Sequence, residues 1–323
     1  MYRKKCRLSI MITQISNLLR IFALNISAIH SRLERISWTS YAILLLVLLI
    51  TQFAINMKDM IIDTMGDRFD LSATVSIFLI FATETCCAVL SIMIGLLRYN
   101  KKIRISKQLF ELENLWSGTQ TVSEKASRFL WLRMFWPFFL FLFFCFLMDL
   151  FSLTSQAPSR ARMIIMMHYS ARLIAWTDIY YFVLILKIVR RNFANVNNEL
   201  IRLAPLATCN LHTIETMCKV HQCLRKICKR QNVLYDTHFW FLTFYLIANI
   251  TAYLFLVISA DVAFLASVGV SNIYVGNVIA MTYLNVHLGI WITFYFILCF
   301  MVLKNVVNTV EEVSGGFNFK LSF

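Results

Sequence analysis

Four side chains that could take part in chemistry lie within one apolar stretch of the chain. His168, Tyr169, Arg172 and Asp178 fall inside the segment 163–187, which is long enough to cross the hydrocarbon of a membrane as a helix. Ionisable residues within a span are costly to bury, so they usually face a partner or a cavity. Arg172 and Asp178 are six residues apart and therefore lie on different faces of a helix, so we expect each to point at another span or at water.

Two interpretations of these residues remain open. They could line a polar pocket that opens to the outside and binds a small molecule, or they could form an ion pair or hydrogen-bond network between helices. Asn285 and His287, at the start of a later apolar segment, are further candidates for a pocket wall, as are Asn249 and Thr251. The residues that we predict to bind a ligand are His168, Tyr169, Arg172, Asp178, Asn285 and His287.

The composition predicts the elements that must position these residues. Hydrophobic residues make up 59% of the chain and charged residues only 15%, which is too apolar for one soluble core. We therefore predict an all-α, polytopic transmembrane helical bundle that forms a single unit over residues 1–323. The six predicted spans are at about 41–57, 73–97, 129–153, 163–187, 238–260 and 283–303.

The distribution of Lys and Arg predicts which way the chain crosses the membrane. On the six-span layout, 25 of the 31 basic residues lie in the amino-terminal segment, the two long loops at 98–128 and 188–237, and the tail, and only four lie on the other side. Basic residues are retained in the cytoplasm, so the amino terminus is expected to be cytoplasmic. This disfavours G-protein-coupled receptors, whose amino terminus is outside.

Two segments leave alternatives open. Residues 1–40 carry apolar positions at helical spacing and predict an amphipathic cytoplasmic segment, lying on the inner membrane surface or packed on the bundle, rather than a cleaved signal. Residues 261–281 contain no Lys or Arg and are apolar. We expect an outer loop or re-entrant segment there; if it were a span instead, the tail would lie outside.

No motif indicates an enzyme, a metal or another cofactor. The chain lacks a phosphate-binding loop, a nucleophile elbow and a zinc-protease motif. Cys218, Cys223 and Cys228 with His212 and His221 lack the paired spacing of a zinc site and instead predict a packed cytoplasmic helix. We expect no nucleic-acid partner, since the basic residues follow the membrane topology.

The layout and three stretches of sequence resemble the insect gustatory receptor family, within the insect chemoreceptor superfamily. The most telling stretch is Tyr180 to Phe193 with the following Asn197-Asn198-Glu199-Leu200. A second runs from Leu224 to Phe244, and a third is Lys304-Asn305-Val306-Val307 with Thr309, Glu311 and Glu312. The resemblance implies a cell-membrane receptor in which four like or different subunits form a cation channel opened by a small organic tastant, which binds in the outer half of the bundle.

One departure from that family matters for the expected function. Members carry a seventh span that lines the pore and has the signature Thr-Tyr, five apolar residues and Gln-Phe. We predict only six spans here, and Thr282-Tyr283, which lies at the start of the sixth, is not followed by the rest of the signature. We therefore expect plausible pocket walls and an incomplete pore. The alternatives are a non-conducting receptor-associated subunit, or a small-solute transporter that uses the same charges to couple flux.

Overall fold

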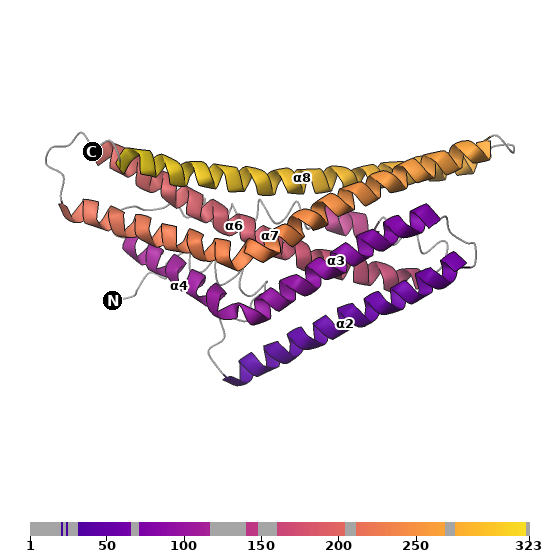
Figure 1. The fold of residues 1–323 in the computed structure, drawn as a ribbon, viewed down its shortest axis with the longest axis horizontal. Helices are drawn as coiled ribbons and strands as arrows, with labels where there is room; N and C mark the ends of the chain where they lie inside the picture. The colour runs from indigo at the N-terminus through magenta and orange to yellow at the C-terminus, as the bar shows by residue number, and fades with distance from the viewer. Residues whose placement is uncertain are drawn as a thin grey trace.

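The computed structural model describes residues 21, 24, 32–65, 71–116, 140–147, 160–203, 211–268 and 275–320. Its long helices are α2 (Arg32–Met65), α3 (Leu71–Leu97), α4 (Tyr99–Trp116), α6 (Arg160–Leu203), α7 (Leu211–Val268) and α8 (Val275–Lys320), with a short helix at 140–147 (Figure 1). The all-α prediction is confirmed for these residues.

Four helical segments are long and apolar enough to cross a membrane. They are Leu33–Lys58, Thr74–Leu97, Phe239–Ser259 and Asn285–Val313. These segments overlap the first, second, fifth and sixth predicted spans; the first begins eight residues earlier than predicted and the last ends ten residues later. The chain is therefore a multi-pass membrane protein by the length and apolar character of its helices.

The other two predicted spans differ from these four. Of the third, 129–153, only the helix 140–147 lies within the described residues. The fourth, 163–187, lies inside the continuous helix α6. It is not among the four apolar segments because Arg172 and Asp178 lower its hydropathy. Both remain predictions as spans.

The loop expected at 261–281 is shorter than predicted. Residues 261–268 complete α7 and residues 275–281 begin α8, and the two helices pack against each other. Figure 1 shows them converging at the end of the molecule where α2 and α3 also meet. Both apolar helices simply continue into the segment, which explains its hydropathy without a separate span. The predicted loops 98–128 and 188–237 are helical where described, as expected.

Helix α6 lies at the centre of the packing. Most of its side chains between Tyr169 and Val189 are buried, against α3, α7 and α8, while α2 packs mainly along α3. Large apolar side chains cover the outer surface of the other helices, such as Leu44, Trp240 and Phe300, which are 57%, 74% and 65% exposed. An apolar exterior around a core that contains polar groups is the arrangement that a bilayer favours.

The joint between α3 and α4 is held by an arginine that reaches across to α7. Arg98 stands between the two helices, and its Nη1 donates to the carbonyl oxygens of Val233 at 3.0 Å and Leu234 at 2.7 Å. Further along, the Cys223 thiol donates to the carbonyl oxygen of Gln108 at 3.6 Å. These contacts fix α4 antiparallel to the first half of α7.

We predict that Arg98→Gln loosens this joint. The substitution removes a charged donor from two carbonyls, at a cost on the order of 1 kcal/mol for a half-buried group. The midpoint of thermal unfolding in detergent should fall, whereas Arg191→Gln, at an exposed position of α6, should leave it nearly unchanged. Equal midpoints for the two variants would contradict the bridging role of Arg98.

Candidate functional site

A buried ion pair between α3 and α6 forms the centre of the candidate site. The Arg172 Nε lies 2.6 Å from Oε1 of Glu84, and each side chain is only 1% exposed. Glu84 stands in the apolar segment Thr74–Leu97, and Arg172 stands on the buried face of α6. A pair of charges in such surroundings persists only with close geometry and further hydrogen bonds.

Aromatic side chains from three helices surround the Arg172 guanidinium. Its Cζ lies 3.8 Å from the ring centroid of Trp291 on α8, a distance typical of a cation–π contact. Tyr169, one turn earlier on α6, and Tyr253 on α7 lie at 5.6 Å and 5.9 Å. Nη2 of Arg172 also donates to the Tyr253 hydroxyl. The rings shield the cation from lipid and partly offset its loss of hydration.

A chain of hydrogen bonds extends the site through the bundle. The Tyr295 hydroxyl donates to Oε1 of Glu84 at 2.9 Å. The hydroxyls of Tyr295 and Tyr245 are 3.2 Å apart, and the indole of Trp176 donates to Tyr245 at 2.8 Å. These four residues lie on α8, α3, α7 and α6. A displacement at Glu84 is therefore felt by all four helices.

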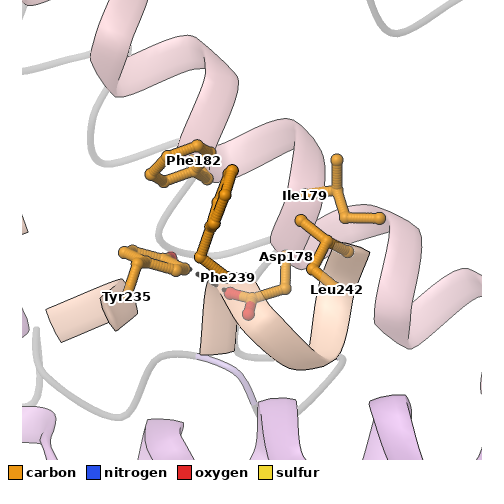
Figure 2. Close-up of a pocket in the computed structure, with 6 residues that line it drawn as sticks. All are labelled: Asp178, Ile179, Phe182, Tyr235, Phe239 and Leu242. Carbon is orange, nitrogen blue, oxygen red and sulfur yellow. Dashed lines mark hydrogen bonds between the residues drawn. The ribbon is translucent and has the colours of Figure 1, made fainter. Parts of the chain in front are cut away.

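A second buried pair joins α6 to α4. The Lys102 Nζ lies 3.5 Å from Oδ1 of Asp178, and both side chains are fully buried. Lys102 also donates to the carbonyl oxygen of Leu24 at 2.9 Å, and the Tyr235 hydroxyl donates to Asp178 at 3.2 Å. Figure 2 shows Asp178 and Tyr235 facing each other beside Phe182, in a hollow with no room for a water molecule.

These contacts settle where most of the predicted ligand-binding side chains lie. Arg172 and Asp178 pair with different helices, as their positions on α6 led us to expect. Tyr169 and Arg172 share one cluster. His287 adjoins it, since its Nε2 accepts a 3.0 Å hydrogen bond from the Trp291 indole.

The remaining predicted side chains lie elsewhere. Asp178 belongs to the separate pair with Lys102. Asn285 is half-buried on α8, two residues before His287. The side chain of His168 lies outside the described residues. The predicted set is therefore divided rather than gathered into one pocket.

Sequence reasoning missed the two partners of these charges. Glu84 is the only Asp, Glu, Lys or Arg between Thr74 and Leu97, and such a residue in an apolar span is a signal in itself. Lys102 gave no comparable signal, because it lies in a basic segment among Lys101, Arg104 and Lys107. Only the packing of α4 against the bundle distinguishes it from those exposed neighbours.

A small polar-walled cavity reaches the central ion pair from the side of α2. Its volume is about 20 Å³, enough for one water molecule. Gln52 and Asn56 of α2, hydrogen-bonded to each other at 3.2 Å, face Glu84 and Thr85 of α3 across it. The apolar part of the wall consists of Leu49, Phe53, Phe81 and Ala171. This cavity gives the buried carboxylate a neighbouring space that one water molecule could enter.

The cysteines of the first half of α7 lie apart from this site. Burial raises the pKa of the Cys228 thiol to about 11 and also raises the pKa of Cys223, so both are protonated at neutral pH. Within the described residues, no three His, Cys, Asp or Glu side chains gather where they could hold a metal ion. The predicted helix is present, but it packs through Met217, Val220, Leu224 and Ile227, whereas Cys218, which the predicted packing face included, is exposed.

Comparison with known proteins adds no assignment to this arrangement. No family model, no curated protein and no solved structure matches the chain.

We predict that Arg172→Met destabilises the protein strongly, whereas Glu84→Gln combined with Arg172→Met restores much of the loss. The single variant leaves the Glu84 carboxylate buried without its cation, at a cost of about 3–5 kcal/mol, and the double variant removes both charges. Unfolding midpoints of the variants in detergent measure this. A double variant that is less stable than Arg172→Met would contradict the pairing.

Proposed function

We propose that the chain is a subunit of a gustatory-type chemoreceptor, a ligand-gated cation channel of the cell membrane that responds to a small organic tastant. It crosses the membrane six times with its amino terminus in the cytoplasm. It assembles as a tetramer with copies of itself or with other receptor subunits. The resemblance of its layout and of the stretches around Tyr180–Phe193 and Leu224–Phe244 to insect gustatory receptors supports this proposal.

The cavity beside Glu84 is the observation on which the proposal chiefly rests. It joins polar side chains from two helices to a carboxylate that already holds Arg172 and Tyr295. The cavity holds about one water molecule in this structure, so α2 must move away from α3 for a ligand to enter. A small ligand with hydroxyl groups can then hydrogen-bond to Glu84, Gln52 and Asn56, with its apolar part against Phe53 and Phe81. Neutral donors suit the site best, since the charges of Glu84 and Arg172 cancel.

Gating follows if the ligand binds one arrangement of the helices more tightly than another. The hydrogen bonds of Glu84 connect α3 with α6 and α8. Helices α7 and α8 continue beyond their apolar segments, and α6 is a continuous helix of 44 residues. A ligand that draws Glu84 toward α2 would shift the balance of these contacts. Such a shift would then be transmitted along long continuous helices to the other end of the bundle.

A transporter is the second candidate, because the charges of the two buried ion pairs could couple the flux of a small solute. This alternative predicts uptake of a labelled solute without ligand-evoked current. Binding to full-length receptors without current or uptake would instead indicate a non-conducting partner subunit.

We predict that Gln52→Leu weakens the response to an agonist. Cells expressing the chain, alone and with other gustatory receptor subunits, are screened with a panel of tastants to find one that evokes a cation current. Loss of one hydrogen bond should raise the half-maximal concentration about 10-fold. Gln222→Leu, the same change at an exposed position of α7, should not. An unchanged response of Gln52→Leu at equal surface expression would rule out the cavity as the binding site.

We also predict that an epitope placed at the amino terminus is inaccessible on intact cells and becomes accessible after permeabilisation. An epitope inserted between α7 and α8 should behave in the opposite way. Staining of the amino terminus on intact cells would refute both the topology and the receptor proposal, since basic residues would then face outward.

A further inference from the structure

Helix α4 and the first half of α7 lie in a register that can be deduced from their contacts. Arg98 bonds to Val233 and Leu234, and Cys223 bonds to Gln108, so the numbers of the paired residues add up to 331 or 332. For two antiparallel helices this sum holds along the whole contact. Residue 101 is therefore level with residue 230, and residue 104 is level with residue 227.

This register brings basic side chains of the two helices to the same levels. The basic surface, as we name it, consists of Lys101, Arg104, Lys107, Lys226 and Lys229, all of which are exposed. On α4 they span six residues, about 9 Å of helix. Three of them come from one helix and two from its neighbour, so five positive charges lie within about two helical turns.

Carboxylates flank the basic surface rather than interrupt it. Among the described side chains of these two helices, Glu111 follows Lys107 by one turn, and Asp236 lies beyond the other end. Glu215 forms an ion pair with Lys219 at 2.7 Å, more than two turns before Lys226. The surface therefore keeps a strong positive potential that favours a multiply charged anion.

The position of the basic surface relative to the apolar segments indicates what kind of anion it meets. Lys101 and Lys107 follow the end of the segment Thr74–Leu97 by four and ten residues, about 6 Å and 15 Å of helix, and the register places Lys229 level with residue 102. The headgroup layer of one leaflet is roughly 5–8 Å thick. The cations thus begin within that layer and continue beyond it, at a depth that suits a large headgroup.

We propose that the basic surface binds the headgroup of a multiply phosphorylated inositol lipid. Clusters of four to eight Lys and Arg directly next to a span attract anionic lipids, and several phosphates on one ring can contact side chains from both helices at once. This binding is independent of any tastant and does not require the chain to conduct ions.

The test uses the purified full chain in neutral detergent micelles and a fluorescent phosphatidylinositol bisphosphate as the probe. We expect the triple variant Arg104→Gln, Lys226→Gln, Lys229→Gln to bind it on the order of 100-fold more weakly, since each cation near an anionic surface contributes about five-fold. The matched control Arg35→Gln, Arg191→Gln, Lys304→Gln removes the same charge at exposed positions of α2, α6 and α8 and should bind within about two-fold of the unchanged protein.

Competition decides what the surface recognises. Phosphatidylserine at equal total charge should displace the probe poorly. Soluble inositol trisphosphate should displace it, but only at higher concentration than the unlabelled lipid, because it lacks the acyl chains that anchor the lipid in the micelle. Equal losses in the two triple variants, or displacement by phosphatidylserine at equal charge, would overturn the proposal in favour of unspecific attraction. Tighter binding of the soluble headgroup or of an oligonucleotide than of the lipid would also overturn it. Unfolding midpoints confirm that both triple variants are folded.

Discussion

The need to hold a positive and a negative charge inside an apolar bundle determines most of this structure. Arg172 and Glu84 are buried to the same extent and lie in direct contact. Neither charge is tolerable there alone, because hydrocarbon and apolar side chains solvate ions poorly. The pair therefore fixes α6 against α3. Its remaining donors and acceptors need Tyr253 and Tyr295, which brings in α7 and α8.

The pair between Lys102 and Asp178 imposes the same constraint on another face of α6. Asp178 lies 240° around the helix from Arg172. One neighbouring helix therefore cannot supply both the acceptor for Arg172 and the donor for Asp178. The consequence is that α4, which has an amphipathic and basic sequence, buries Lys102 against the bundle while Lys101 stays exposed. Two ion pairs on different faces explain why α6, which is less apolar than α2, α3, α7 and α8, lies at the centre of the packing.

Sequence patterns were sufficient for the helices but not for their partners. Apolar runs located four spans because the bilayer sets their minimum length, although the first apolar segment begins eight residues before its predicted start and the last ends ten residues after its predicted end. The position of Arg172 and Asp178 on α6 showed that they could not pair with each other. Which groups complete them could not be deduced. Glu84 was detectable as a lone carboxylate in a span, whereas Lys102 differs from its exposed neighbours only through tertiary packing.

The aromatic shell around Arg172 was hidden for a different reason. Tyr169, Tyr253 and Trp291 come from three helices that are far apart in the sequence, and the chain is rich in aromatic residues throughout. Their types alone therefore do not single them out. Only the relative rotation of α6, α7 and α8 makes these particular rings neighbours, and rotation follows from packing rather than from periodicity.

Stability alone does not account for the central ion pair. Apolar side chains of similar volume often hold helices together as well as a buried pair does, because they avoid the loss of hydration. A polar-walled cavity next to Glu84 also adds less to packing than apolar side chains that filled the same volume would. Both features make sense together if the carboxylate exchanges part of its bonding between Arg172, Tyr295 and something that enters from the side of α2. A network that connects four helices through one carboxylate is then a means of converting that small exchange into a change of helix packing.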